Sequence, residues 1–171
     1  MKYAVIDVGS NTVRLCVYDV LCPEKRKFKT IMNRKIMAGL AAYIVDGAFS
    51  DEGIAEAILA VRKCIKRASY LSPDRIDVFA TAVLRNISNS AQAIAAIEQG
   101  AGCSISLLSN ADEAHLGFVG ASSRGTLDDG ALIDIGGGST EITVIENGID
   151  VARTSLPQGS LSSYKRFVGD I

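Results

Sequence analysis

Two acidic residues flank a run of three glycines in the segment ALIDIGGGSTEITV, residues 131–144. Asp134 lies shortly before the glycines at 136–138, Ser139 and Thr140 follow them directly, and Glu141 comes next. Glycines have no Cβ and can take positive φ, so the N–H groups of such a turn can converge on one anion at close range. The segment therefore predicts a turn that binds an oxyanion, with the two hydroxyls as additional donors.

The acid in front of this turn adds a requirement for a cation. A bare carboxylate at Asp134 would repel a bound phosphate unless a divalent cation lay between the two groups. Asp134 and Glu141 together therefore predict a site for Mg²⁺ or a similar ion. The alternative is a hairpin turn whose glycines only satisfy backbone geometry.

The amino-terminal end of the sequence repeats this pattern. When AVIDVGSNTVRLCVYD (residues 4–19) is laid over ALIDIGGGSTEITVIE (residues 131–146), Ala, Ile, Asp, Gly and Val coincide, and Asp7 falls on Asp134. A flexible linker has no reason to repeat a hairpin, or to lie between two runs of β-branched residues. The repeat predicts two similar turns, each joining two strands.

Apolar periodicity predicts the elements that must position these turns. Strands are expected at residues 3–8 and 13–20, within 26–37, at 76–81 and 103–108, and on both sides of the glycines at 136–138. Helices are expected from an N-cap at Ser50 to near Leu71, over 90–100 with Gly100 as the stop, over 111–121, and from near Ser160. The result is a mixed α/β order.

The polar, turn-rich segment at 122–130 predicts a boundary between an amino-terminal lobe, residues 1–122, and the beginning of a second lobe, residues 123–171. The second segment can supply about three strands and part of a helix. Such a sheet leaves one face and one edge uncovered unless it packs on the first lobe or on another chain. Either a homodimer that covers this incomplete lobe or partial disorder of this end is therefore expected.

Composition limits the classes of function. Lys and Arg number 18 against 19 Asp and Glu, and no stretch is basic enough to bind duplex nucleic acid. No apolar run reaches the roughly 20 residues of a membrane span, and no signal peptide is evident, so a cytoplasmic protein is expected. The four cysteines lack C-x-x-C spacing and are expected to be free thiols. His115 is the only histidine, which argues against a histidine-centred metal cluster.

Five ordered motifs allow a narrower comparison: IDVGSNTVRL, ATAVLRN, SNADEAHLGFVGA, LIDIGGGSTEI and SLPQGS, which together extend from residue 6 to residue 160. This combination resembles the exopolyphosphatase and guanosine pentaphosphate phosphohydrolase (Ppx/GppA) family. The resemblance implies an actin-like (ribonuclease H-like) ATPase-superfamily fold, with one complete lobe and the start of a second. It also implies metal-assisted attack of water on the terminal phosphate of inorganic polyphosphate or guanosine pentaphosphate.

The resemblance also implies roles for individual residues. Glu113 matches the position of the general base. The acids that match the metal-side positions are Asp7, Asp134 and Glu141. The residues that match phosphate-binding positions are Gly9, Ser10, Asn11, Arg14, Arg85, Gly136, Gly137, Gly138 and Ser139. Arg85 is expected in a loop between a strand and a helix, where its planar donor fork suits an oxyanion.

Other interpretations of these residues stay open. Glu113 and Asp112 could be first-turn acids that stabilise a helix N-terminus, and Arg14 and Arg85 could be ordinary surface charges. The segment Ser109-Asn110-Ala111-Asp112-Glu113-Ala114 departs from the family's usual Ser-Gly-x-Glu-Glu-Ala. Three hypotheses remain: a phosphoanhydride hydrolase, a non-catalytic polyphosphate or alarmone binder, and an ATP-dependent member of the wider superfamily. No P-loop motif is present, and the glycines lead into a strand instead of a helix.

Overall fold

The computed structural model describes residues 1–24, 27–123, 125 and 127–168. Packing divides the chain into two compact units, residues 1–107 and residues 108–171. This division falls earlier in the chain than the predicted lobe boundary between residues 122 and 123. The reason is that the helix after residue 109 packs on the sheet of the second unit. Positions 124 and 126 of the predicted boundary segment lie outside the described residues.

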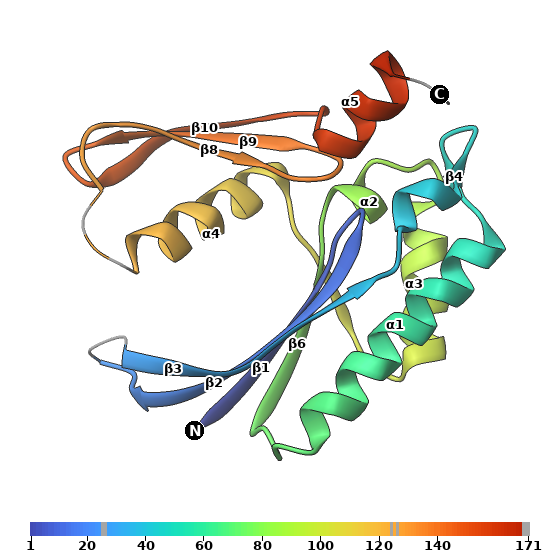
Figure 1. The fold of residues 1–171 in the computed structure, drawn as a ribbon, viewed down its shortest axis with the longest axis horizontal. Coiled ribbons are helices and arrows are strands. Elements are labelled where there is room, and N and C mark those ends of the chain that lie inside the picture. The colour runs from blue at the N-terminus through green and yellow to red at the C-terminus, as the bar shows by residue number, and fades with distance from the viewer. Residues whose placement is uncertain (25–26, 124, 126, 169–171) are drawn as a thin grey trace. The chain divides into compact units, whose positions relative to one another are not determined.

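The first unit is built on a five-stranded sheet with the order β3-β2-β1-β6-β7 (Figure 1). Its strands are β1 (Lys2–Val8), β2 (Thr12–Cys22), β3 (Lys27–Met37), β6 (Arg75–Ala80) and β7 (Ile105–Leu107). β2 is antiparallel to both β1 and β3, whereas β6 is parallel to β1 and to β7. The carboxyl ends of β1 and β6 therefore lie at the same edge of the sheet, next to the turn that joins β1 to β2.

Helices cover one face of this sheet. They are η1 (Leu40–Tyr43), a 3-10 helix, and α1 (Asp51–Ser69), α2 (Ala82–Arg85) and α3 (Ser90–Ala101), with the short β4 (Ile44–Val45) and β5 (Ala48–Phe49) between η1 and α1. Ile6, Val8, Val13 and Leu15 alternate along β1 and β2, and each is fully buried in the same cluster as residues of α1 and α3. The predicted N-cap is confirmed, since the Ser50 hydroxyl accepts a hydrogen bond from the Gly53 N–H at 3.2 Å.

The predicted end of the second long helix was wrong. α3 continues through Gly100 to Ala101, and Gly102 takes the left-handed conformation, with φ at 69°, that ends it. A Cβ on Gly100 would lie 2.4 Å from Ile58 Cδ1 of α1. Gly100 therefore serves the close packing of two helices, while Gly102 provides the stop.

The second unit contains a three-stranded antiparallel sheet with the order β10-β9-β8. Its elements are α4 (Asn110–Ser122), β8 (Gly130–Ile135), β9 (Thr140–Glu146), β10 (Ile149–Leu156) and α5 (Ser160–Phe167). The Ser109 hydroxyl accepts from the Asp112 N–H at 3.1 Å and caps α4. α4 packs along the sheet, where Thr143 and Ile145 of β9 are buried.

The predicted strands and long helices are confirmed, apart from shifts of a few residues at their ends. η1, α2 and the β4–β5 pair were not predicted, because each is too short to show a period in the sequence. No helix among the described residues is long and apolar enough to cross a membrane.

Candidate functional site

The first predicted turn joins β1 to β2. The Gly9 N–H donates to the Thr12 carbonyl at 3.0 Å, and a Cβ on Gly9 would lie only 3.2 Å from that oxygen. The exposed Asp7 of β1 lies directly opposite Arg14 of β2. Glycine therefore lets the hairpin close tightly, with an acid and a base flanking the turn on neighbouring strands.

The second predicted turn, between β8 and β9, has the same local geometry. The Gly136 N–H donates to the Ser139 carbonyl at 2.9 Å, and a Cβ on Gly136 would again lie 3.2 Å from the accepting oxygen. Asp134 lies directly opposite Glu141, as Asp7 lies opposite Arg14. The repeat seen in the sequence thus extends to the strand register and to the closing hydrogen bond.

The glycines of the second turn do not adopt the positive φ that the sequence suggested. Among the described glycines, positive φ is found elsewhere, as at Gly39 and Gly148, and not at positions 136–138. The restriction at Gly136 is close approach of backbone atoms. Absence of a Cβ, not left-handed backbone, is what this turn requires.

The carbonyls of the second turn are held by the segment that follows β10. Ser160 N–H donates to the Gly136 carbonyl at 2.9 Å, and Leu161 N–H donates to the Gly137 carbonyl at 3.0 Å. The Ser160 hydroxyl also donates to the Gly136 carbonyl, at 3.1 Å. Within the described part of the chain, no hydrogen bond uses the N–H of Gly137 or Gly138 as donor. These amides are therefore available to an anion.

The first turn is held in the same way by the segment that follows β3. Gly39 N–H donates to the Asn11 carbonyl at 2.9 Å, and Ala41 N–H donates to the Ser10 carbonyl at 2.8 Å. Ser10 itself is buried, with 7% of its surface exposed. Both turns are thus fixed through their carbonyl groups, which leaves the opposite, N–H side of each peptide for a ligand.

Gly159 is a site residue that sequence reasoning missed. A Cβ at this position would lie 2.6 Å from the Gly136 oxygen and 2.6 Å from the Gly137 carbonyl carbon, closer than real Cβ contacts. The carbonyl of Gln158, the residue before Gly159, accepts a hydrogen bond from the Thr140 hydroxyl at 2.6 Å. The motif SLPQGS was the available signal, but the sequence alone did not show which element this glycine touches.

The acids of the second unit suit a magnesium ion. The Glu141 side chain is 5% exposed and its Oε1 accepts a hydrogen bond from the Ser155 hydroxyl at 2.9 Å, while Asp134 on the opposite strand is exposed. Mg²⁺ is commonly bound through one or two carboxylates, with waters and substrate oxygens completing its shell. Asp134 and Glu141 fit that pattern. The described residues contain no group of three or more His, Cys, Asp or Glu side chains around one point.

Glu113 lies in the first turn of α4, where its N–H donates to the Ser109 carbonyl at 3.0 Å. A Cβ on Gly117, one helical turn later, would lie 3.9 Å from Asp134 Oδ2. Residues four apart share one face of a helix, so Glu113 lies on the face of α4 that meets β8. The structure therefore places the predicted base in the same unit as the second turn, on the side of its acid.

Arg85 is the last residue of α2, not part of a loop as predicted. The three preceding residues of this single helical turn, Ala82, Val83 and Leu84, are buried, which pins the turn against the core. Because β6 runs parallel to β1, with Ala80 opposite Val8, α2 begins at the sheet edge where the Gly9 turn lies. Arg85 thus follows the strand that ends beside the first turn.

His115 contacts a carboxylate of the second sheet. Its Nδ1 lies 2.7 Å from Asp150 Oδ2, and Arg153 Nε donates to the same oxygen at 2.5 Å. Hydrogen bonds from Arg153 and His115 lower the pKa of Asp150 to about 2. The contact joins α4 to β10.

The sheets, the helices that cover them and the paired glycine turns define a mixed α/β protein, as predicted. The sequence profile of the Ppx/GppA phosphatase family matches residues 22–170. The chain therefore belongs to the Ppx/GppA phosphatase family. The profile match begins after the first turn and therefore does not include it.

Those structural matches cover almost the whole chain. An exopolyphosphatase from Cytophaga hutchinsonii superposes with a TM-score of 0.87 at 25% identity, over 98% of this chain and 54% of that one. The Ppx/GppA family member of Aquifex aeolicus gives 0.80 at 22% identity, over 98% and 54%. The ethanolamine utilization protein EutJ from Carboxydothermus hydrogenoformans gives 0.56 at 22% identity, over 99% and 58%. The chain thus spans about half the length of these proteins.

Proposed function

We propose that this chain hydrolyses the terminal phosphoanhydride bond of inorganic polyphosphate or of guanosine pentaphosphate. Membership of a phosphatase family supports the class of reaction. The observation that carries the proposal is the duplicated turn, in which an acid precedes a glycine whose N–H closes the hairpin at 3.0 Å in one unit and 2.9 Å in the other. Each of these turns, taken by itself, suits a phosphate group.

Phosphate oxygens would be bound by the turn amides and by arginine. In the first turn these are the N–H groups of Ser10 and Asn11, and in the second those of Gly137 and Gly138, with Ser139 beside them. Arg14, on β2 next to the first turn, adds a positive charge, and Arg85 adds a planar set of donors that matches phosphate geometry. Because the turns are fixed through their carbonyls, these donors are preorganised for an anion.

A divalent cation is part of the proposal. Asp134 and Glu141 would hold Mg²⁺ in the second unit, and Asp7 is the matching acid of the first turn. When bound, the cation would neutralise negative charge on the phosphate oxygens. The partly buried Ser155–Glu141 hydrogen bond of 2.9 Å would fix the orientation of this ligand carboxylate in advance.

Glu113 is the proposed general base. Its carboxylate would accept a proton from the attacking water as the water oxygen bonds to the terminal phosphorus. The bond from that phosphorus to the bridging oxygen breaks in the same step, and the shortened phosphate compound leaves. The position of Glu113 on the face of α4 that meets Asp134 supports this role. Its neighbour Asp112 has a different environment, because the Ser109 hydroxyl donates to its carboxylate at 2.6 Å.

A second copy of the chain is the proposed macromolecular partner. The face of the β8–β10 sheet away from α4 presents side chains that include Ile133, Val144 and Leu156, all exposed. These residues alternate with those that face α4, so they lie together on one face of the sheet. A patch of this kind is typical of an interface. No nucleic-acid partner is proposed.

Phosphate release and binding, measured in parallel, test the proposal. The chain would be incubated with polyphosphate or with guanosine pentaphosphate, in Mg²⁺ or in chelator, and the same mixtures examined for binding. Magnesium-dependent release from either compound is the expected result and names the preferred substrate. Binding without release would favour the non-catalytic binder. If the chain neither binds these compounds nor releases phosphate from them, the assignment of the two turns as phosphate-binding sites is wrong.

A further inference from the structure

A row of charged side chains crosses the first three strands beside the first turn. Asp7 of β1 lies opposite Arg14 of β2, and Arg14 lies opposite Lys35 of β3. Directly opposite residues of antiparallel strands point to the same face of the sheet. Since neighbouring strands are about 4.8 Å apart, Lys35 lies two strand spacings from Asp7. Neither the motifs nor the repeat had singled out Lys35.

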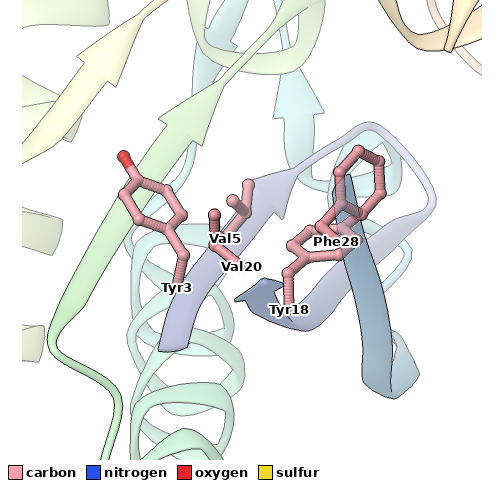
Figure 2. Close-up of a pocket in the computed structure, with 5 residues that line it drawn as sticks. All are labelled: Tyr3, Val5, Tyr18, Val20 and Phe28. Carbon is pink, nitrogen blue, oxygen red and sulfur yellow. The ribbon is translucent and has the colours of Figure 1, made fainter. Parts of the chain in front are cut away.

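This row lies on the face of the sheet opposite the buried helical face. Val13 and Leu15, the neighbours of Arg14, are fully buried under the helices, so Arg14 points to the other side. Asp7 and Lys35 are exposed there. Farther from the turn, the same face forms an apolar pocket of about 270 Å³ lined by Tyr3, Val5, Tyr18, Val20 and Phe28 (Figure 2). The charged row therefore lies at the end of this face next to the turn. At the far end, Arg75 and Asp77 of β6, which contact Tyr3, form a salt bridge with each other.

The Arg14–Lys35 pair has an unfavourable arrangement in the free protein. Like charges directly opposite each other on neighbouring strands destabilise a sheet. Neither side chain forms a salt bridge with any carboxylate in the described part of the chain. A bound polyanion would relieve the repulsion by placing negative charge next to both groups.

Protection of an edge strand is the other explanation for a lysine on β3. The strand lies at the edge of the sheet, and exposed lysines there discourage pairing with other chains. Lys27 and Lys29 of the same strand already provide this protection. Edge protection gives no reason to place a lysine directly opposite an arginine in the row that starts at Asp7.

We propose that Lys35 extends the phosphate site of the first turn, so that the site takes a linear chain of several phosphates in preference to a single small phosphate. The inference rests on the proposed function, since it assumes a phosphate at the first turn. Arg14 would contact the phosphates nearest the turn and Lys35 those farther along the chain. The flexible lysine ammonium acts as a point charge, which suits a flexible chain without fixed geometry.

The test compares two substitutions on neighbouring positions of β3. Arg34 is exposed like Lys35, but it lies opposite the buried Leu15 and therefore belongs to the other face. Dissociation constants would be measured for long-chain polyphosphate and for pyrophosphate. We expect Lys35→Glu to weaken binding of the long chain by about fivefold or more, and pyrophosphate binding by less than about twofold. Arg34→Glu should leave both constants within about twofold of the wild-type values.

The outcomes separate this inference from the proposed function. If wild-type protein binds neither compound, the proposed function fails. If it binds both and Lys35→Glu weakens long-chain binding no more than Arg34→Glu does, the inference fails and the function stands. Equal weakening of long-chain and pyrophosphate binding also overturns the inference, because Lys35 would then not contact phosphates that only the longer chain has. Lys35→Gln, which removes the charge without reversing it, repeats the comparison should Lys35→Glu unfold.

Discussion

At the scale of single residues, the acids of the second turn have distinct environments. Glu141 is buried and hydrogen bonded to Ser155, whereas Asp134 is exposed at the end of β8. The sequence showed that two acids bracket the glycines. It did not show that they lie directly opposite each other, because this depends on the register of β8 and β9.

The carboxylate of Asp134 provides a prediction about cation binding. Asp134→Asn should weaken Mg²⁺ binding by about tenfold or more. Loss of a residue that only hydrogen bonds to a metal ligand already costs about tenfold or more in affinity, and loss of the ligand itself should cost at least as much. Asp128→Asn is the matched control, as Asp128 is an exposed acid of the same unit away from the turn. Isothermal titration with Mg²⁺ in the absence of substrate measures the effect. Equal affinities for the two variants would argue against Asp134 as a ligand.

Asp150 provides a prediction about pH. Hydrogen bonds from Arg153 and His115 lower the pKa of its carboxyl from 3.8 to about 2. A carboxyl with a lower pKa in the folded state stabilises the fold above its unfolded pKa, and this contribution is lost as the pH falls through the folded value. The melting temperature of the wild type should therefore exceed that of Asp150→Asn at pH 7, and the difference should shrink between about pH 4 and about pH 2. A pH-independent difference in thermal unfolding would contradict this account.

At the scale of elements, the long periodic segments were predictable and the short supporting ones were not. The apolar face of α1 and the alternation in β1 and β2 are repeated often enough to be recognised in the sequence. α2 is a single helical turn and leaves no such period, so Arg85 was expected in a loop. Gly100 was taken for a helix stop because its contact with Ile58 comes from a distant part of the sequence.

The support of the second turn by the start of α5 gives an element-scale prediction. In Gly159→Ala, the new methyl group would meet the Gly136 oxygen at 2.6 Å, so the turn must shift at a cost of about 1–3 kcal/mol. Binding of phosphate compounds should weaken by about tenfold or more. The stabilisation of the protein by ligand, measured as a shift in melting temperature, reports this directly.

Gly120→Ala is the control for that experiment. Gly120 lies in α4 of the same unit, and a Cβ there would meet nothing within 4 Å. This variant should bind normally and be slightly more stable, since alanine is a better helix former than glycine. If Gly159→Ala binds as well as Gly120→Ala, the segment after β10 does not position the turn.

At the scale of the whole molecule, the sequence predicted the α/β architecture and the family, because motifs and hairpin patterns are local. The division of the chain into two units could not be placed from composition alone. The polar segment at 122–130 suggested a boundary, but α4 packs with the sheet that follows it, through contacts such as that of His115 with Asp150. Packing of this kind depends on which helix face meets which strand.

The exposed face of the second sheet leads to a prediction about assembly. Ile133 is 58% exposed on this face, and burial of such a side chain in an interface would be lost on substitution by lysine. Sedimentation velocity should show dimers of the wild type and monomers of Ile133→Lys. Leu59→Lys is the control, because Leu59 is a 50% exposed apolar residue of α1 in the other unit. A wild type that stays monomeric at all concentrations would contradict the proposed homodimer.

The most direct test of the central claim is turnover by the Glu113→Gln variant. Phosphate release from polyphosphate in Mg²⁺ would be compared among the wild type, Glu113→Gln and Asp112→Asn, with substrate binding measured for each. Loss of a general base costs about 10²–10⁴-fold, so Glu113→Gln should lose turnover to that extent while still binding substrate. Asp112→Asn, in the same helical turn, should keep both. Turnover by Glu113→Gln at the wild-type rate would contradict the assignment of Glu113 as the base.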